Sequence, residues 1–316
     1  MNILIVGAGG QIGSELIPHL QSLYGEDNII AADNSREKVE RLEKFSRVVQ
    51  LDALDINLYK EIIENYKIDR IYNLAALLSA TGEKNPIGAW RINMGILNNS
   101  LELARSYNCS LFTPSSIAAF GPSTPSTNTP QDTIMRPNTI YGVCKVAGEL
   151  LSDYYHQRYG VDTRSVRFPG LISYGTLPGG GTTDYAVEVF YEVIEKGSFI
   201  SPLSENCYLD MLYMPDALKA CSDLMECDPA KLKHRNSFNV TAMSFSPKEL
   251  FAEIKRHLPQ AQFSYNPDPL KSQIAAGWPD SIDDSAARAE WGWDPQWNLD
   301  SMSRDMIEKI SLKLSK

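Results

Sequence analysis

Apolar residues form short runs bounded by turn residues through the first half of the chain. These runs are Ile3–Val6, Asn28–Ala32, Arg47–Leu51, Ile68–Leu74 and Ser110–Pro114. Segments between them show helical spacing, as in the apolar positions from Ile56 to Tyr66. Strands that alternate with helices in this way predict a parallel sheet with right-handed crossovers and helices on both faces. The first half therefore predicts a doubly wound α/β fold.

The middle of the chain departs from this alternation. Residues 121–139 are rich in Pro, Ser and Thr and show little apolar periodicity. A stretch of this length inside a compact domain is usually functional. Beyond it, the pattern predicts a long helix from about residue 140 to Tyr159 and a strand at Thr163–Arg167.

After about Leu171 the pattern becomes irregular and rich in proline. A chain of 316 residues can bury one large core and a smaller lobe. We expect a first domain over residues 1–170, with a return segment near residues 207–245 that rejoins the sheet at Arg235–Val240. Most of residues 171–316 should form a smaller C-terminal lobe that binds the substrate.

Composition narrows the class of partner. The net charge of -9 argues against nucleic acid, because binding a phosphate backbone needs clustered Lys and Arg. No apolar run reaches about 18 residues, so we expect no membrane span. Because Met1 is followed at once by the first predicted strand, we also expect no targeting segment. Five cysteines without a C-x-x-C pair favour a cytoplasmic protein. None of the four histidines lies beside a cysteine or in an H-E-x-x-H pattern, so we expect no metal site.

Three glycines, Gly7, Gly10 and Gly13, follow the opening strand with the spacing G-x-x-G-x-x-G and precede a helix. Residues without a Cβ let backbone N–H groups and a helix N-terminus approach a pyrophosphate. Asp33 ends the next apolar run, about 20 residues later, where a carboxylate accepts hydrogen bonds from an adenosine ribose and repels a 2′-phosphate. The pattern predicts a Rossmann-type site that prefers NAD to NADP.

These residues also fit other interpretations. The glycines can serve strand–helix packing alone, with Asp33 capping a helix through residues 36–44. Arg36 keeps NADP open, because an arginine shortly after Asp33 can reach a phosphate. Asp52 and Ala53 end the third strand and are expected beside the adenine, although an ordinary strand-end turn explains them equally well.

Tyr141 and Lys145 lie four residues apart in the predicted long helix, which places both side chains on one face. A phenol is a poor base near neutrality unless a neighbouring cation favours the phenolate, and Lys145 supplies that cation. Ser116 follows the fifth strand, at the edge where open α/β sheets bind ligands, and its hydroxyl can orient a substrate oxygen. Taken alone, the Tyr–Lys spacing also fits a surface pair on an amphipathic helix.

Together these motifs resemble the extended short-chain dehydrogenase/reductase superfamily, in its nucleotide-sugar epimerase-like branch. The resemblance covers nearly the whole chain and includes Asn73-Leu74-Ala75-Ala76, Arg167-Phe168-Pro169-Gly170 and Tyr213-Met214-Pro215-Asp216-Ala217. It implies an oxidoreductase in which Ser116 orients the substrate, Tyr141 is the acid/base and Lys145 contacts the cofactor ribose. The expected NAD contacts are Gly7, Gly10, Gln11, Ile12, Gly13, Asp33, Asp52, Ala53, Tyr141, Lys145 and Leu171.

Several stretches resemble the short-chain family of L-threonine 3-dehydrogenases more closely. They are Ala76–Ala80, Ser116–Pro122, Pro178–Ala186 and Trp291–Trp293, of which the glycine run before Thr182-Thr183-Asp184 is the most distinctive. This resemblance implies oxidation of the L-threonine 3-hydroxyl to 2-amino-3-oxobutyrate. The expected substrate contacts are Ser79, Ser116, Tyr141, Thr182 and Asp184.

Some of these contacts have simpler explanations. Thr182 and Asp184 also fit a helix N-cap after a glycine-rich loop, and the glycines favour a loop that closes on the substrate. Ser79 can simply end the fourth strand. Leu171 is expected near the nicotinamide, but packing between the lobes explains it equally well.

The same residues bear on two alternative functions and on the assembly state. A nucleotide-sugar epimerase or dehydratase would need basic groups for two phosphates, yet residues 171–204 carry only Lys196. A non-catalytic NAD-sensing regulator would not need Ser116, Tyr141 and Lys145. The predicted helices near Ala89–Tyr107 and Tyr141–Tyr159 carry apolar residues on more than one face, so we expect a homodimer.

Overall fold

The chain folds into two compact units built from interleaved segments. The computed structural model describes residues 1–176, 179 and 181–315. The first unit takes Met1–Ala119, Thr139–Arg167 and Leu218–Phe238, and the second takes Phe120–Asn138, Phe168–Ala217 and Asn239–Lys316. Residues 218–238 of the first unit lie within the return segment expected near residues 207–245, whereas residues 120–138, expected in the first domain, group with the second unit.

A parallel sheet of six described strands forms the centre of the first unit. Its strand order is β3-β2-β1-β4-β5-β7, which is the order of the doubly wound dinucleotide-binding fold. The predicted fold class is therefore confirmed. The strands are β1 (Asn2–Val6), β2 (Ile29–Asp33), β3 (Arg47–Gln50), β4 (Ile68–Asn73), β5 (Ser110–Phe112) and β7 (Thr163–Arg164).

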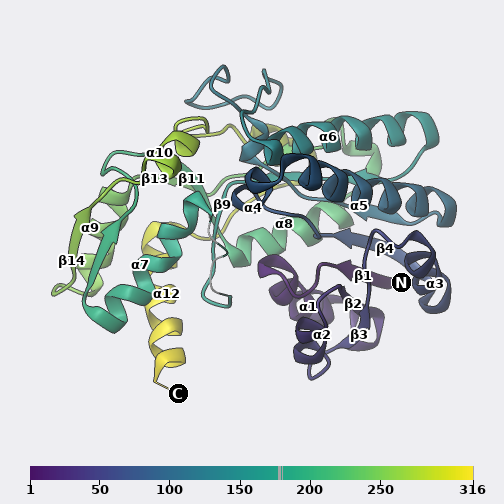
Figure 1. The fold of residues 1–316 in the computed structure, drawn as a ribbon, viewed down its shortest axis with the longest axis horizontal. Helices are drawn as coiled ribbons and strands as arrows, with labels where there is room; N and C mark the ends of the chain where they lie inside the picture. The colour runs from purple at the N-terminus through teal and green to yellow at the C-terminus, as the bar shows by residue number, and fades with distance from the viewer. Residues whose placement is uncertain (177–178, 180, 316) are drawn as a thin grey trace. The chain divides into compact units, whose positions relative to one another are not determined.

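Helices cover both faces of this sheet because its strands are apolar on both sides. On one face, Leu4, Val6 and Ile30 pack against α3 and α5, where Tyr59 and Leu101 are buried. Helix α6 runs beside α5 on this face (Figure 1) and adds Leu151 and Tyr155 to the same cluster. The alternate residues of these strands point to the other face, where α1 contacts β1 and β2. The helices of the first unit are α1 (Gln11–Tyr24), α2 (Arg36–Leu42), α3 (Ile56–Tyr66), α4 (Ser79–Lys84), α5 (Pro86–Tyr107), α6 (Ile140–Tyr159) and α8 (Met214–Glu226), with short 3-10 turns η1 (Glu26–Asn28), η2 (Ile117–Ala119) and η4 (Pro229–Lys231).

The predicted strand at Thr163–Arg167 is two strands that belong to different sheets. The first part, β7, joins the central sheet, whereas β8 (Val166–Phe168) pairs with β6 (Ser115–Ser116) and β12 (Phe238–Asn239). Ser165 lies at the change of sheet, where its N–H donates to the carbonyl of Arg235 at 3.1 Å and its carbonyl accepts from Phe238 at 2.9 Å. The late segment at Arg235–Val240 therefore does not rejoin the central sheet as predicted, because it pairs in this smaller one.

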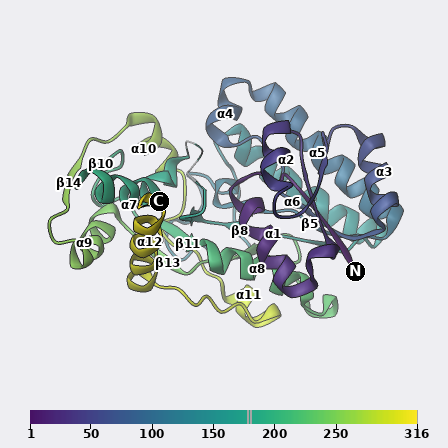
Figure 2. The ribbon, with the colours of Figure 1, turned by 90° about the horizontal axis from the view of Figure 1, so that it is seen from below.

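Helix α8 comes late in the chain and is anchored at its C-terminus by two buried arginines. Arg70 donates to the carbonyl of Met225 at 3.1 Å, and Arg164 donates to the carbonyl of Leu224 at 2.6 Å. Hydrogen bonds from charged donors stabilise a fold by about 1.5–3 kcal/mol each, and cations also favour a helix C-terminus. Helices α1 and α8 lie side by side (Figures 1 and 2), with His19 and Ser222 at 3.0 Å.

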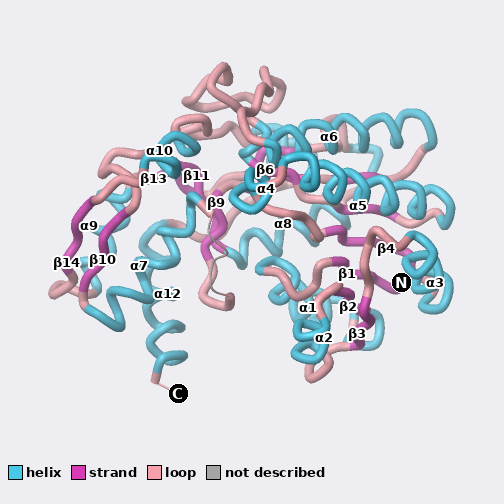
Figure 3. The backbone as a smooth tube through the Cα atoms, viewed as in Figure 1, coloured by secondary structure: helices cyan, strands magenta, loops and turns pink. Residues whose placement is uncertain are grey.

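The second unit is built around its own apolar core. Strands β9, β11 and β13 form one small sheet and β10 pairs with β14, as the magenta segments of Figure 3 show. Tyr185, Phe190, Met211 and Met302 are buried in this core. Its elements are β9 (Gly170–Ile172), η3 (Thr182–Asp184), α7 (Tyr185–Lys196), β10 (Ser198–Ser201), β11 (Leu209–Tyr213), β13 (Met243–Phe245), α9 (Pro247–His257), β14 (Gln262–Tyr265), α10 (Pro269–Ala275), α11 (Ser285–Trp291) and α12 (Leu299–Leu314). Among the described residues, no helix combines the length and the apolar character that crossing a membrane requires.

Candidate active site

The glycine turn brings backbone close to backbone at the carboxyl end of β1. Gly7 has a φ of +80°, and a Cβ there would lie 2.8 Å from the backbone nitrogen of Ala75. A Cβ on Gly13 would lie 2.7 Å from Cα and O of Ala8. Gly10 precedes the first turn of α1, which Gln11 and Ile12 begin, and no side chain caps this helix N-terminus. Its N–H groups are therefore available to a phosphate.

Asp33 lies between the glycine turn and the start of α2, where its Oδ1 accepts the N–H of Ser35 at 3.0 Å. It is 4% exposed, and its Oδ2 accepts a hydrogen bond from the N–H of Gly9 at 2.9 Å. Helix α2 is capped instead by Ser35, whose Oγ accepts from the N–H of Lys38. Arg36 pairs with Glu40 at 3.0 Å, so its guanidinium is engaged on the helix surface. The interpretation of Asp33 as the helix cap is therefore wrong.

A cleft of about 260 Å³ opens at the carboxyl ends of β1, β2, β3 and β4. Gly7, Gly10, Asp33, Asp52 and Ala53 all line it, as expected for a cofactor site. Sequence reasoning missed other lining residues, which are Val6, Asn34, Lys38, Leu51, Leu74, Ala75, Ala76, Leu77, Ile92 and Ile96. Those at 74–77 directly follow β4. Their position after a parallel strand is the signal that identifies them, because carboxyl ends of parallel strands share one edge.

Lys38 is the one cation among the residues that line this cleft. Its Nζ lies 3.9 Å from Oδ2 of Asp33, and its side chain is partly exposed. Asp33 places a negative charge where an adenosine ribose binds in this fold, and Lys38 offsets part of that charge. The arrangement still favours a ribose without a 2′-phosphate, because the buried Asp33 carboxylate repels a phosphate, whereas Lys38 is partly exposed to water.

Ser116, Tyr141 and Lys145 all belong to the first unit. Tyr141 is in the first turn of α6, which begins where Thr139 Oγ1 accepts the N–H of Gly142 at 3.1 Å. Lys145 is one turn later, with its Nζ 5.2 Å from the centroid of the Tyr141 ring. Ser116 ends β6, and α6 packs against β6 and η2. The structure thus brings a phenol, an ammonium and a hydroxyl to one region.

The predicted substrate contacts are divided between the two units. Ser79 begins α4 in the first unit, and α4 packs against α6, with the N–H of Ile140 donating to Glu83 at 2.7 Å. Thr182 and Asp184 lie in η3 of the second unit, where Thr182 is buried. The Asp184 carboxylate accepts the N–H of Gly181, the residue before η3, and as the N-cap residue of α7 it makes no side-chain capping hydrogen bond. In the glycine-rich loop, Leu177, Pro178 and Gly180 lie outside the described residues.

Leu171 lies on β9 of the second unit, opposite Leu212 of β11, and is half-buried. Its predicted place near the nicotinamide stays a prediction.

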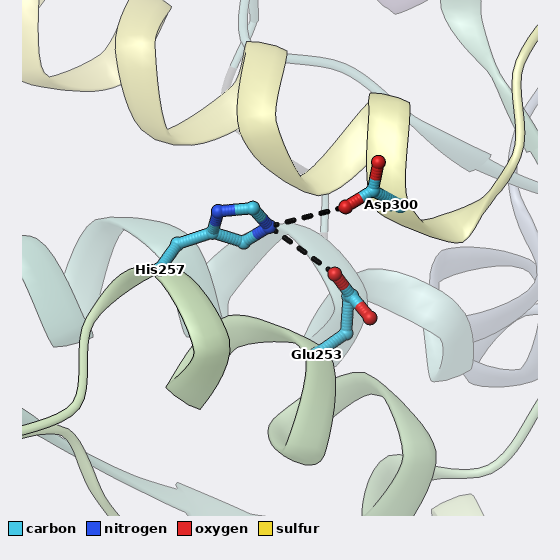
Figure 4. A group of neighbouring side chains, drawn as sticks. All are labelled: Glu253, His257 and Asp300. Carbon is cyan, nitrogen blue, oxygen red and sulfur yellow. Dashed lines mark hydrogen bonds and ion pairs between the residues drawn. The ribbon is translucent and has the colours of Figure 1, made fainter.

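One other group of side chains resembles a metal site in composition. Glu253 and His257 of α9 and Asp300 of α12 converge, with His257 Nε2 at 3.1 Å from Glu253 and 3.6 Å from Asp300 (Figure 4). However, Arg256 pairs with Glu253 at 2.8 Å and Arg304 with Asp300 at 2.9 Å. Two guanidinium groups beside the carboxylates oppose a divalent cation. The group is therefore best described as an ion-pair network between α9 and α12.

The residues around the cleft fit NAD. Close backbone approach at Gly7 and Gly13 and an uncapped helix N-terminus suit a pyrophosphate. Asp33 suits the two hydroxyls of an adenosine ribose, and the apolar side chains of Leu51 and Ile96 suit an adenine.

Comparison with known proteins agrees with this geometry. The model of the NAD dependent epimerase/dehydratase family matches residues 3–240. An uncharacterized epimerase/dehydratase of Staphylococcus aureus (strain USA300) is 50% identical over 98% of this chain and 97% of its own. The X-ray structure of the L-threonine dehydrogenase of Clostridium difficile is 51% identical, with a TM-score of 0.97 over 99% of this chain and 98% of that one. The holo form of an L-threonine dehydrogenase of Cupriavidus necator is 47% identical, with a TM-score of 0.93 over 98% of this chain and 100% of that one. NAD as the cofactor is confirmed by these matches.

Proposed function

Because the chain belongs to the NAD-dependent epimerase/dehydratase family, we propose that it oxidises the 3-hydroxyl of L-threonine to 2-amino-3-oxobutyrate. The observation that carries the proposal is the group formed by Ser116, Tyr141 and Lys145 beside a cleft that fits NAD. The high identity to two L-threonine dehydrogenases over nearly the whole chain supports the same substrate. The family and these relatives also support NAD-dependent dehydrogenase activity more generally.

In the proposed mechanism, Tyr141 is the acid/base that accepts the proton of the threonine 3-hydroxyl. The ammonium of Lys145 lies 5.2 Å from the centroid of the Tyr141 ring, where it stabilises negative charge that develops during the proton transfer. Ser116 donates a hydrogen bond to the substrate oxygen and orients it toward Tyr141. Bound NAD+ supplies the acceptor for the hydride, so the products are 2-amino-3-oxobutyrate, NADH and a proton.

We propose that the amino-acid end of threonine meets Ser79, Thr182 and Asp184. A hydroxyl suits the carboxylate, and the carboxylate of Asp184 suits the ammonium group. Asp184 already accepts the N–H of Gly181. A carboxylate has room for several hydrogen bonds, so capping does not prevent this second contact.

The proposal is tested by measuring NADH formation from NAD+ and L-threonine with purified protein. Replacing Tyr141 with Phe removes the acid/base, and we expect activity to fall by about 10²–10⁴-fold in protein that still folds and binds NAD. Tyr154→Phe is the matched control, because Tyr154 is an exposed tyrosine of the same helix. It should retain full activity.

Two results would contradict the proposal in different ways. If folded, NAD-binding wild-type protein leaves L-threonine unchanged while oxidising another alcohol, the substrate is wrong. If Tyr141→Phe oxidises threonine as fast as Tyr154→Phe, the assigned base is wrong.

A further inference from the structure

A buried ion pair joins α6, which carries Tyr141 and Lys145, to β8, the strand paired with β6 and Ser116. Glu149 is one turn after Lys145 on α6 and is 5% exposed, and Arg167 of β8 is 4% exposed. Arg167 donates to both carboxylate oxygens, through Nε to Oε1 at 3.0 Å and through Nη2 to Oε2 at 2.8 Å. Buried ion pairs are costly to desolvate and are often no more stabilising than an apolar pair. Stability alone therefore does not explain this pair.

The same carboxylate contacts the segment that carries Ser116. Oε1 of Glu149 also accepts a hydrogen bond from the hydroxyl of Ser115. One turn earlier, Nζ of Lys145 donates to the carbonyl of Pro114 at 2.6 Å. Helix α6 thus binds two consecutive residues through two charge-assisted hydrogen bonds, and Ser116 is the next residue. Such bonds are short and directional, so they fix the position of this segment relative to α6 as well as stabilising it.

Packing does not define this position by itself. A cavity of about 50 Å³ lies between α6 and the segment, and Pro114, Ser115, Lys145 and Glu149 are among the residues that line it. Where side chains do not fill the space, van der Waals contact cannot fix the distance between a helix and a strand end. The residues that the hydrogen bonds of Lys145 and Glu149 join all line this incompletely filled region.

We propose that Glu149 and Arg167 are positioning residues that fix Ser116 in register with Tyr141. Arg167 orients the carboxylate, and the carboxylate binds Ser115, which sets where the neighbouring Ser116 hydroxyl lies relative to α6. The proposal rests on the proposed function for the roles of Ser116 and Tyr141. Neither Glu149 nor Arg167 is assigned a contact with the substrate.

The first test compares Ser115→Ala with Ser165→Ala. Both serines are buried and line the same cavity, but Ser165 bonds Ser237 at 2.6 Å instead of α6. We expect Ser115→Ala to lower kcat by about 10–100-fold with unchanged affinity for NAD, and Ser165→Ala to retain wild-type kcat. Ser115→Thr restores the hydroxyl and should recover most of the loss. Equal kcat values in Ser115→Ala and Ser165→Ala would overturn the proposal.

The second test is a double-mutant cycle. Replacing the pair with Glu149→Leu and Arg167→Met leaves apolar side chains of similar volume, which preserves folding. This variant should lose as much kcat as Ser115→Ala, and adding Ser115→Ala to it should cause no further loss, because both changes remove one shared contact. Losses that multiply would show that Ser115 and the ion pair act independently, and the proposal would fail.

A third measurement does not depend on threonine. Hydrogen exchange of a peptide covering residues 114–119 should be faster in Ser115→Ala than in Ser165→Ala, because the segment has lost its bond to α6. Wild-type protein without threonine activity would refute the proposed function, and the exchange rates would then decide the positioning role. Unchanged exchange in Ser115→Ala refutes the positioning role even if threonine is oxidised.

Discussion

Asp210 is a carboxylate that the fold keeps away from water. It is 1% exposed, its Oδ1 accepts the hydroxyl of Thr241 at 2.6 Å, and its Oδ2 has no hydrogen-bond partner. Burial raises the pKa of Asp210 from 3.8 to about 7, and the hydrogen bonds from Thr241 and from the backbone of Ile282 oppose this shift only in part. The native state therefore retains a proton that the unfolded chain releases at much lower pH.

The sign of the pH dependence follows from this difference. Because the native state binds the proton more tightly, the free energy of unfolding should fall as the pH rises from about 4 to about 7. The pKa difference corresponds to on the order of 4 kcal/mol. Asp210→Asn, which mimics the protonated acid, should remove this part of the slope and be more stable than wild type at pH 8. Urea unfolding across that pH range measures the difference.

Asp216→Asn is the control for this experiment. Asp216 is also buried, but both of its oxygens accept backbone N–H groups, from Gln296 at 2.9 Å and from Trp297 at 3.1 Å. Its replacement should lower stability at pH 5 and pH 8 alike. If Asp210→Asn shows the same slope as wild type, Asp210 is ionised in the native protein at neutral pH.

At the residue scale, local spacing predicted some site residues and not others. Asp33, Tyr141 and Lys145 stand at fixed distances from a strand end or from each other, and this spacing has a chemical reason that can be read from one sequence. No such spacing links Glu149 with Arg167, because these two residues meet only through the pairing of β8 with β6. That pairing depends on the change of sheet at Ser165, which no local pattern indicates.

Among the elements, the packing of α1 on β1 sets the geometry of the cofactor cleft. We expect Gly13→Ala to weaken NAD binding by more than about 10-fold, because its Cβ would overlap the backbone of Ala8 and move α1 away from the turn. Fluorescence titration with NAD measures the change. In the control, Gly197→Ala, nothing lies within 4 Å of the new Cβ, but the φ is +73°. It should cost about 1 kcal/mol of stability and leave NAD affinity unchanged. Wild-type affinity in Gly13→Ala would contradict the role of this contact.

Element type was easier to predict than element pairing. The strands of the central sheet follow from apolar runs between turn residues, and the structure confirms them at β1 to β5. The interval at Thr163–Arg167 also looks like one strand, because it is short and continuous, and both of its halves are buried although most of its side chains are polar. Only the hydrogen bonds of Ser165 with Arg235 and Phe238 divide it, and these join residues about 70 positions apart.

For the whole molecule, the homodimer stays a prediction with a clear structural test. Val143, Leu150 and Tyr154 are exposed on α6 at positions spaced by seven and four, which places them on one helix face. An exposed apolar stripe of this kind is typical of an interface between copies. Light scattering should give the mass of two chains for wild type and of one chain for Leu150→Glu. Leu312→Glu, at a residue 56% exposed on α12, should remain dimeric. A monomeric wild type would refute the prediction.

The interleaving of the two units bears on how the chain folds during synthesis. The first unit draws in residues 218–238, so α8 joins it only after residues 120–138 and 168–217 of the second unit have been translated. Until then, Arg70 and Arg164 lack the carbonyls of Met225 and Leu224, and the sheet face that α8 later buries stays open to water. A nascent chain that has emerged only to residue 170 therefore exposes apolar surface of the kind that chaperones bind. Late closure by a distant segment also raises the contact order, which slows folding.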